Sequence, residues 1–171
     1  MRINVAGLLK ESVGQTRSYE ITGETLVSDW DKFDSVRAPV RMLRTDQGIL
    51  VEAEVAGATR ETCSRCLRPV TIEVTATVEE EFYPTNTFDG LMAVPGLEAD
   101  GGSAFAIDEK NILVLSEAMR QALVSAAPLA PMCGVGCQGI CPHCAADRNV
   151  DPCECQEHPG AQWSKLQELN L

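Results

Sequence analysis

Eight cysteines in a chain of 171 residues are the residues with the clearest chemistry. Six of them fall within residues 133–155, and the other two form a separate C-x2-C pair upstream. Spacings this short can direct several thiolates at one metal ion. The number suits two four-cysteine sites, or one site with spare thiols. The cysteines are Cys63, Cys66, Cys133, Cys137, Cys141, Cys144, Cys153 and Cys155.

The primary expectation is a four-cysteine zinc site in the tail. Cys141-x2-Cys144 has the spacing of half a zinc-ribbon site, and Cys153-x-Cys155 places two further sulfurs near one ion at a bend. Cys137 in place of Cys141 is an alternative ligand. Zinc is favoured over an iron–sulfur cluster because the C-x2-C-x2-C spacing of ferredoxins is absent. A structural metal would also stabilise a tail with few large apolar residues.

The upstream pair, Cys63 and Cys66, allows three interpretations. It could be a hairpin with two half-buried thiols, or a redox motif, although a redox C-x-x-C favours a strand-to-helix context. The third interpretation is a second zinc knuckle completed by Cys133 and Cys137, which would tie the tail to the sheet. Cys63, Cys66, Cys133 and Cys137 are therefore the secondary metal-ligand candidates.

Composition and charge argue against binding of nucleic acid by bulk charge and against a membrane-spanning protein. The net charge of −11 comes wholly from residues 69–171, because residues 1–68 hold ten basic and ten acidic side chains. Such an acidic chain does not attract nucleic acid by bulk charge. No apolar run approaches the ~20 residues of a membrane span, and the start lacks a signal-peptide core. We therefore expect a cytoplasmic protein, in which clustered cysteines are more often metal ligands than disulfides.

Arginines supply the one local concentration of positive charge. Arg60, Arg65 and Arg68 surround the first cysteine pair, after three more arginines on the preceding segment, Arg37, Arg41 and Arg44. Arginine suits phosphate recognition through its planar fork. The alternative is that these are ordinary surface arginines paired with nearby glutamates.

The pattern of the remaining chain predicts an α+β fold. Val70, Ile72, Val74, Ala76 and Val78 alternate with polar residues, which is typical of a half-buried antiparallel strand. We expect at least three antiparallel strands between residues 39 and 83 and a tight turn at residues 46–48. The sheet could curl into a half-barrel. The domain prediction is a β-rich domain over 1–88, an acidic Gly/Pro linker over 89–105, a helix packing on the sheet over 106–127, and a cysteine-rich zinc-stabilised tail over 128–171.

These residues resemble the YceD family of large-subunit ribosomal RNA accumulation proteins, formerly a domain of unknown function. The resemblance rests on Cys63-Ser-Arg-Cys-Leu-Arg-Pro69, the strand running into Glu79-Glu-Glu-Phe-Tyr83, and Cys137-Gln-Gly-Ile-Cys-Pro-His-Cys144 with the later C-x-C. It covers about residues 39–171. The chain departs from the family pattern in two places, and both concern a local turn: Ala145 replaces a usual Gly, and Asp147-Arg148-Asn149 stands where Asn-Leu-Asn is usual.

The resemblance implies a cytosolic factor needed for accumulation of 23S ribosomal RNA and for large-subunit biogenesis, without enzymatic activity. Its partner would be precursor RNA, contacted through Arg60, Arg65 and Arg68, or a ribosomal protein of the large subunit; no membrane or small-molecule substrate is expected. One alternative is a zinc-stabilised protein-interaction module, or an acidic chaperone for a basic ribosomal protein. Another is a thiol redox enzyme, although no Ser/His/Asp set, phosphate loop or H-E-x-x-H helix accompanies the cysteines.

Overall fold

The computed structural model describes residues 1–85 and 105–155, which form two compact units. The first unit comprises Met1–Glu61 and Thr71–Leu129, and the second comprises Thr62–Val70 together with the chain from Ala130 onward. The second unit thus joins the connection between two neighbouring strands to a segment that follows much later in the chain. The predicted linker over 89–105 lies outside the described residues, except for Phe105.

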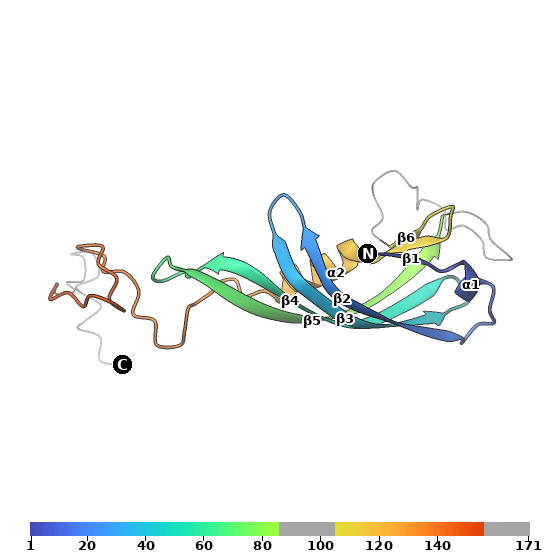
Figure 1. Cartoon of the computed structure of the whole chain (residues 1–171), viewed down its shortest axis with the longest axis horizontal. Coiled ribbons are helices and arrows are strands. Elements are labelled where there is room, and N and C mark those ends of the chain that lie inside the picture. Colours follow the sequence, from blue (N-terminus) through green and yellow to red (C-terminus); the bar gives the residue numbers. More distant parts are fainter. Residues whose placement is uncertain (86–104, 156–171) are drawn as a thin grey trace, which may run out of the picture. The chain divides into compact units, whose positions relative to one another are not determined.

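The first unit is built on a seven-stranded sheet that curls into a half-barrel (Figure 1). The strand order across the sheet is β1-β7-β6-β5-β4-β3-β2. The sheet is antiparallel, as expected, at the pairs β1–β7, β6–β7, β2–β3 and β3–β4, but β5 and β6 run parallel. The bounds are β1 Arg2–Asn4, α1 Ala6–Leu9, β2 Thr16–Val27, β3 Lys32–Arg44, β4 Ile49–Thr62, β5 Pro69–Pro84, β6 Ala106–Ile107, β7 Ile112–Val114 and α2 Ser116–Ala126.

Period-two burial explains why the long strands form. Along β4, every second residue from Ile49 to Thr59 is buried, and the residues between them are more exposed. Along β5 the buried positions are Val74, Val78, Phe82 and Pro84, which share a face with the half-buried Val70, Ile72 and Ala76. The predicted apolar face of this strand is therefore confirmed.

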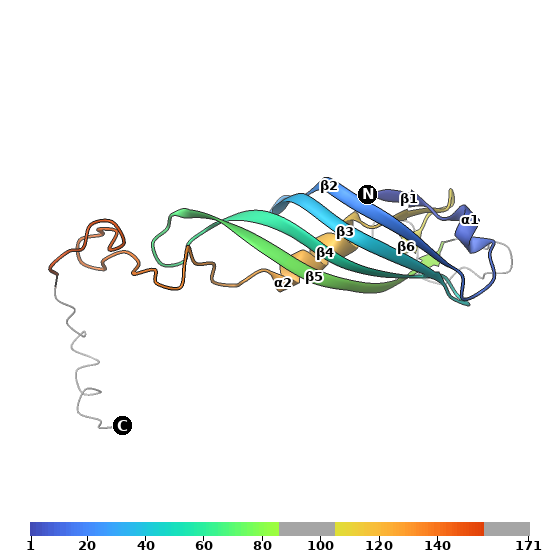
Figure 2. The ribbon, with the colours of Figure 1, turned by 60° about the horizontal axis from the view of Figure 1, so that its bottom comes forward.

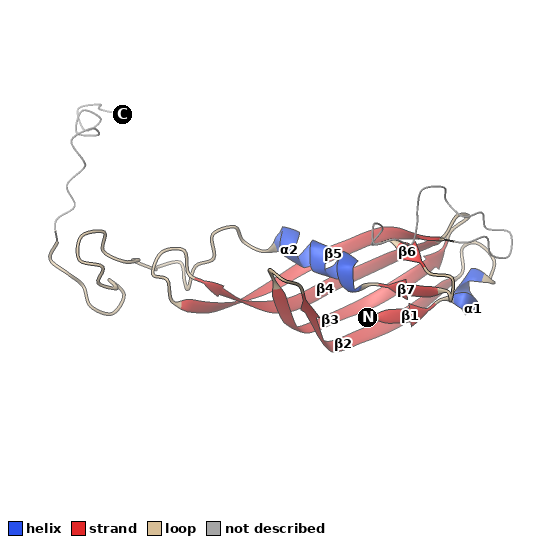
Figure 3. Cartoon of the chain, turned by 90° about the horizontal axis from the view of Figure 1, so that it is seen from above, coloured by secondary structure: helices blue, strands red, loops and turns tan. Residues whose placement is uncertain are grey.

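Helix α2 covers one face of the sheet, while the strands β2–β5 present their other face on the opposite side (Figures 2 and 3). Leu115, Met119 and Leu123 form its buried stripe and belong to the same hydrophobic core as the strands. The helix occupies only residues 116–126 of the segment predicted as helical, because residues 106–107 and 112–114 form β6 and β7. No side chain caps the N-terminus of the helix, and the Ser116 hydroxyl accepts a 2.5 Å hydrogen bond from the Met1 ammonium.

The turn predicted at residues 46–48 is confirmed and is unusually tight. The Thr45 amide donates to the Gly48 carbonyl at 3.1 Å, and the Gly48 amide donates to Thr45 Oγ1 at 2.8 Å. A Cβ on Gly48 would collide with the carbonyl oxygen of Phe82, so only glycine permits this approach of β4 to β5. The Arg44 guanidinium is buried here and donates to the carbonyls of Leu9, Thr45 and Gly48, which makes it a structural residue.

The tip of the β2–β3 hairpin carries two aromatic side chains with opposite surroundings. Trp30 is 95% exposed, whereas Phe33 is 2% exposed and belongs to the core of β3. Asp31 fixes the tip to α2 by accepting a 2.7 Å bond from Arg120 Nη1. Of the two aromatic residues, only Phe33 therefore anchors this turn.

Protonation of Glu117 is expected to destabilise the first unit at acid pH. Arg120 donates two hydrogen bonds of 2.9 and 2.6 Å to this carboxylate and lowers its pKa from 4.5 to about 2. Because the folded pKa lies below the unfolded one, the contribution is complete above about pH 4.5 and is lost as the pH falls towards 2. Glu117→Gln should flatten the pH dependence of the free energy of unfolding in that window; Glu109→Gln, the same change at an exposed side chain, is the matched control. Identical pH profiles for Glu117→Gln and the wild type would contradict this assignment.

Within the described residues, none of the helices is both long and apolar enough to cross a membrane.

Candidate metal centre

The first cysteine group begins in the connection between β4 and β5. The Cys63 amide donates to the Arg68 carbonyl at 2.8 Å, and the Leu67 amide donates to the Cys63 carbonyl at 3.0 Å. These bonds close a tight knuckle, in which Leu67 adopts a left-handed conformation with φ +57°. The knuckle places the sulfurs of Cys63 and Cys66 on its inner side.

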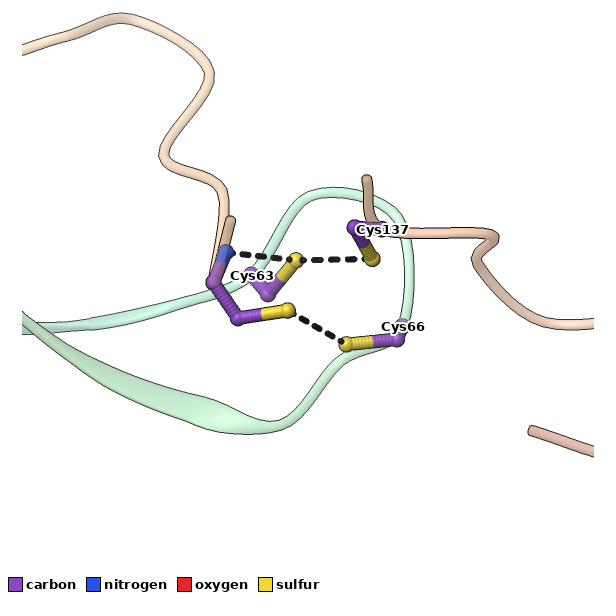
Figure 4. A group of neighbouring side chains, drawn as sticks. Cys63, Cys66 and Cys137 are labelled. Carbon is purple, nitrogen blue, oxygen red and sulfur yellow. Dashed lines mark hydrogen bonds between the residues drawn. The ribbon is translucent and has the colours of Figure 1, made fainter. Parts of the chain in front are cut away.

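Two cysteines from residues 130–137 complete this group. The Cys63 and Cys137 sulfurs lie 3.8 Å apart, and those of Cys66 and Cys133 lie 3.6 Å apart (Figure 4). All four sulfurs lie within 4.8 Å of one another. Around a zinc ion with Zn–S bonds of about 2.3 Å, tetrahedral sulfurs are about 3.8 Å apart. The measured separations therefore fit one tetrahedrally coordinated ion.

The surroundings of the first group favour the thiolate form of some of its sulfurs, and thiolates bind cations. Backbone N–H groups of Cys66, Arg65 and Cys133 point at the Cys63 sulfur and lower its pKa to about 6. The side chain of Arg68 lowers the pKa of Cys66, whereas the neighbouring Cys137 sulfur raises the pKa of Cys133 to about 12. Some of these sulfurs are thus stabilised as thiolates while others retain protons. A divalent cation would displace those protons, because metal-bound cysteines are deprotonated.

The second cysteine group is formed by Cys141, Cys144, Cys153 and Cys155, whose sulfurs also lie within 4.8 Å of one another. Cys141 is buried, and Cys144 and Cys155 are exposed. The N–H groups of Cys144 and His143 lower the pKa of Cys141 to about 5, whereas the Cys144 sulfur raises that of Cys155 to about 12. The second group therefore repeats the pattern of the first, with more solvent exposure.

A short turn holds this second knuckle. The Cys141 amide donates to the Ala146 carbonyl at 2.8 Å, and the Ala145 amide donates to the Cys141 carbonyl at 2.9 Å. Ala145 has φ +59°, a conformation that glycine adopts at lower cost. The turn closes despite the departure from Gly at this position, and the conformation explains why Gly suits it.

The structure thus assembles eight of the predicted ligands into two groups. Cys141, Cys144, Cys153 and Cys155 lie together, and so do Cys63, Cys66, Cys133 and Cys137. The alternative set, in which Cys137 replaces Cys141, is not assembled, because the Cys137 sulfur lies with Cys63. None of the eight cysteines forms a disulfide in this structure. Both groups could hold a metal ion.

The three arginines considered for RNA binding differ in their surroundings. Arg65 is exposed and forms no ion pair among the described residues. Arg68 Nε pairs with Asp147 Oδ2 at 3.2 Å and lies beside the Cys66 sulfur. Arg60 belongs to the first unit and lines a cavity of about 560 Å³. That cavity is rich in carboxylates, which belong to Asp29, Asp31, Asp34 and Glu61.

Residues 147–149 are important at this centre although the sequence does not mark them as ligands. Arg148 Nη2 lies 3.8 Å from the Cys141 sulfur, and Asn149 Nδ2 lies 3.7 Å from the Cys137 sulfur. Each bond therefore reaches a different cysteine group. In the sequence, these residues stand out only because they depart from the family pattern. That departure points to a local turn and does not predict that their side chains contact cysteine sulfurs.

Comparison with known proteins places this centre in a family context. The sequence profile described as "Large ribosomal RNA subunit accumulation protein YceD" matches residues 51–170, which include both cysteine groups. The YceD family is not a known enzyme family. No solved structure gives a significant match.

Similar proteins occur in mycobacteria and are described as uncharacterized. Proteins of Mycobacterium tuberculosis and Mycobacterium bovis are each 30% identical over 131 residues, which is 76% of this chain and 59% of theirs. A protein of Mycobacterium leprae is 24% identical over 147 residues, 85% of this chain and 63% of its own. The matched region thus spans about three-fifths of the length of these relatives. The match of 51–170 confirms the resemblance seen in the sequence, and the chain belongs to the YceD family.

Proposed function

We propose that this protein is a non-catalytic factor in the accumulation of large-subunit ribosomal RNA and in the biogenesis of that subunit. The observation that carries the proposal is the family match over residues 51–170, which spans β4, β5, α2 and both cysteine groups. The described residues offer an exposed arginine beside a rigid knuckle, a feature suited to binding. The partner in this proposal is precursor ribosomal RNA.

Zinc is the proposed metal of both cysteine groups, in a structural role. Four cysteine thiolates in a tetrahedral arrangement are a common structural zinc site, and such a site leaves no coordination position open for substrate. The sulfur separations of 3.8 and 3.6 Å support this assignment for the first group. Purified protein should be colourless and contain close to two zinc ions per chain. Visible absorbance with bound iron would contradict zinc.

The RNA contact is proposed to centre on Arg65. Its guanidinium is exposed, whereas Arg68 already pairs with Asp147 and Arg60 lies among carboxylates. The backbone of Arg65 is held in place, because its carbonyl accepts a 3.0 Å bond from the Ile140 amide. A fixed backbone with a free guanidinium suits contact with a phosphate group. Arg60 and Arg68 remain secondary candidates.

Charge reversal tests this contact. Arg65→Glu is expected to weaken association with large-subunit precursors, and to lower the slope of log affinity against log salt concentration by about 1, because one phosphate contact is lost. Arg37→Glu is the matched control, since it makes the same charge change at an exposed position of β3. The measurement is co-sedimentation with precursor particles across a salt series.

The result also separates RNA from protein as the partner. Co-sedimentation that is unchanged in Arg65→Glu would contradict an RNA contact at this residue. Retention of a ribosomal protein after nuclease treatment would favour the alternative of an acidic chaperone for a basic ribosomal protein.

A further inference from the structure

The two cysteine groups share one connecting segment, the turn formed by Asp147, Arg148 and Asn149. Arg148 Nη2 lies 3.8 Å from the Cys141 sulfur of the second group, and Asn149 Nδ2 lies 3.7 Å from the Cys137 sulfur of the first. N–H···S bonds stabilise thiolates and orient them, and such outer contacts tune the affinity of a metal site. This turn therefore touches sulfurs of both groups at once.

Asp147 fixes the geometry of the turn. Its Oδ1 accepts bonds from the Asn149 amide at 2.9 Å and from Asn149 Nδ2 at 2.6 Å. Its Oδ2 pairs with Arg68, beside the Cys66 sulfur, at 3.2 Å. The Asn149 side chain is thus anchored although the residue is exposed. Because the Asn149 amide is bonded to both the Cys137 sulfur and Asp147, a change at that sulfur, such as metal binding, also affects the position of Asp147.

The backbone also links the knuckles. The Ile140 amide donates to the Arg65 carbonyl at 3.0 Å, which joins the first knuckle to the residue before Cys141. The Arg148 amide donates to the Gly139 carbonyl at 3.0 Å, and the Gln138 amide donates to Asn149 Oδ1 at 2.8 Å. Residues 138–140 therefore pair with the first knuckle on one side and with the turn on the other.

We infer that the Asp147–Asn149 turn couples the two sites, so that they load metal cooperatively. Filling either site orders the shared turn, and the second ion then binds to a site whose ordering cost has already been met. The coupling is reciprocal, and typical couplings between sites change affinity by roughly 5- to 150-fold. Arg148 and Asn149 are positioning residues in this scheme. The inference rests on the proposed metal role of both groups.

The distribution of bound zinc distinguishes coupled from independent sites. With one zinc ion bound per chain on average, two independent sites leave at least about half of the chains singly loaded; for sites of equal intrinsic affinity, couplings of the typical size lower that fraction to between about one third and one thirteenth. Full-length protein, reduced and stripped of metal, is titrated with zinc alone and examined by native mass spectrometry. We expect chains with no zinc and with two zinc ions to predominate.

Asn149→Asp tests the residue. The substituted carboxylate still accepts from the Gln138 amide but can donate neither to the Cys137 sulfur nor to Asp147 Oδ1, so the singly loaded fraction should return to about half or more. Gln138→Glu is the control, because it adds the same charge at an exposed side chain without removing an N–H···S donor. Arg148→Met provides a second test in case Asn149→Asp folds poorly. It removes the bond to the Cys141 sulfur of the second group and should also raise the singly loaded fraction.

Two results would overturn the coupling. One is a singly loaded fraction of half or more in the wild type that neither Asn149→Asp nor Arg148→Met raises; the other is a low fraction retained in both variants. Failure of the wild type to bind zinc at all would overturn the proposed metal role, and the coupling with it. Two zinc ions bound independently would overturn the coupling alone.

Discussion

Replacing Cys63 by serine is expected to remove one of the two proposed zinc ions and to loosen the second unit. Cys63 is fully buried, and its sulfur lies 3.8 Å from that of Cys137. Binding of a structural zinc contributes on the order of 10–16 kcal/mol to folding of small metal domains, so loss of one ligand has a large effect. Metal content per chain and the rate of proteolysis within residues 130–155 are the measurements.

The neighbouring serine provides the control for this experiment. Ser64→Ala leaves the backbone bond from its amide to the Pro131 carbonyl and alters no sulfur, so it should retain both ions. A metal content unchanged by Cys63→Ser would remove Cys63 from the ligand set. The same substitution at Cys141 tests the second group independently.

Phe82→Ala is expected to lower the free energy of unfolding of the first unit by about 3–5 kcal/mol. The ring is fully buried and packs edge-to-face on Phe105, with the centroids 5.7 Å apart. Truncation leaves a cavity at the point where Gly48 brings β4 against the Phe82 carbonyl. The measurement is urea denaturation followed by far-UV circular dichroism.

Phe82→Leu is the matched variant, because it keeps an apolar side chain and should cost less than the alanine. A loss below about 1 kcal/mol in Phe82→Ala would show that the sheet closes without this ring. The residues Glu79–Tyr83 that carry part of the family resemblance include this core position. Their presence therefore reflects the core of the fold as well as any binding role.

The sequence predicts the middle of the sheet better than its edges. Strand β5 is found from alternation because apolar and polar residues strictly alternate between Val70 and Val78. Strand β2 is missed because it lies at an edge of the sheet, where only Ile21 and Leu26 are buried. An edge strand has one neighbour and few residues in the core, so its pattern carries little signal. Strands β6 and β7 are two and three residues long, too short for any period to show.

The candidate metal centre shows a different limit of prediction from sequence. Spacing finds the knuckles, because two residues between cysteines fix a local geometry. Spacing does not decide how knuckles pair, since Cys137 is four residues from Cys141 but lies with Cys63. That choice depends on long-range bonds such as the one from the Ile140 amide to the Arg65 carbonyl. The side chains of Arg148 and Asn149 become informative only once the sulfurs are placed.

The first cysteine group brings together residues that are made at well-separated times during translation. Cys63 and Cys137 are 74 positions apart, and Cys66 and Cys133 are 67 apart. A nascent chain that has not yet reached residue 133 has only two of the four sulfurs, which is half of a tetrahedral site. Closure of this site thus waits until residue 137 has been made, and a prematurely terminated product that lacks residues 133–137 cannot be held together in the same way.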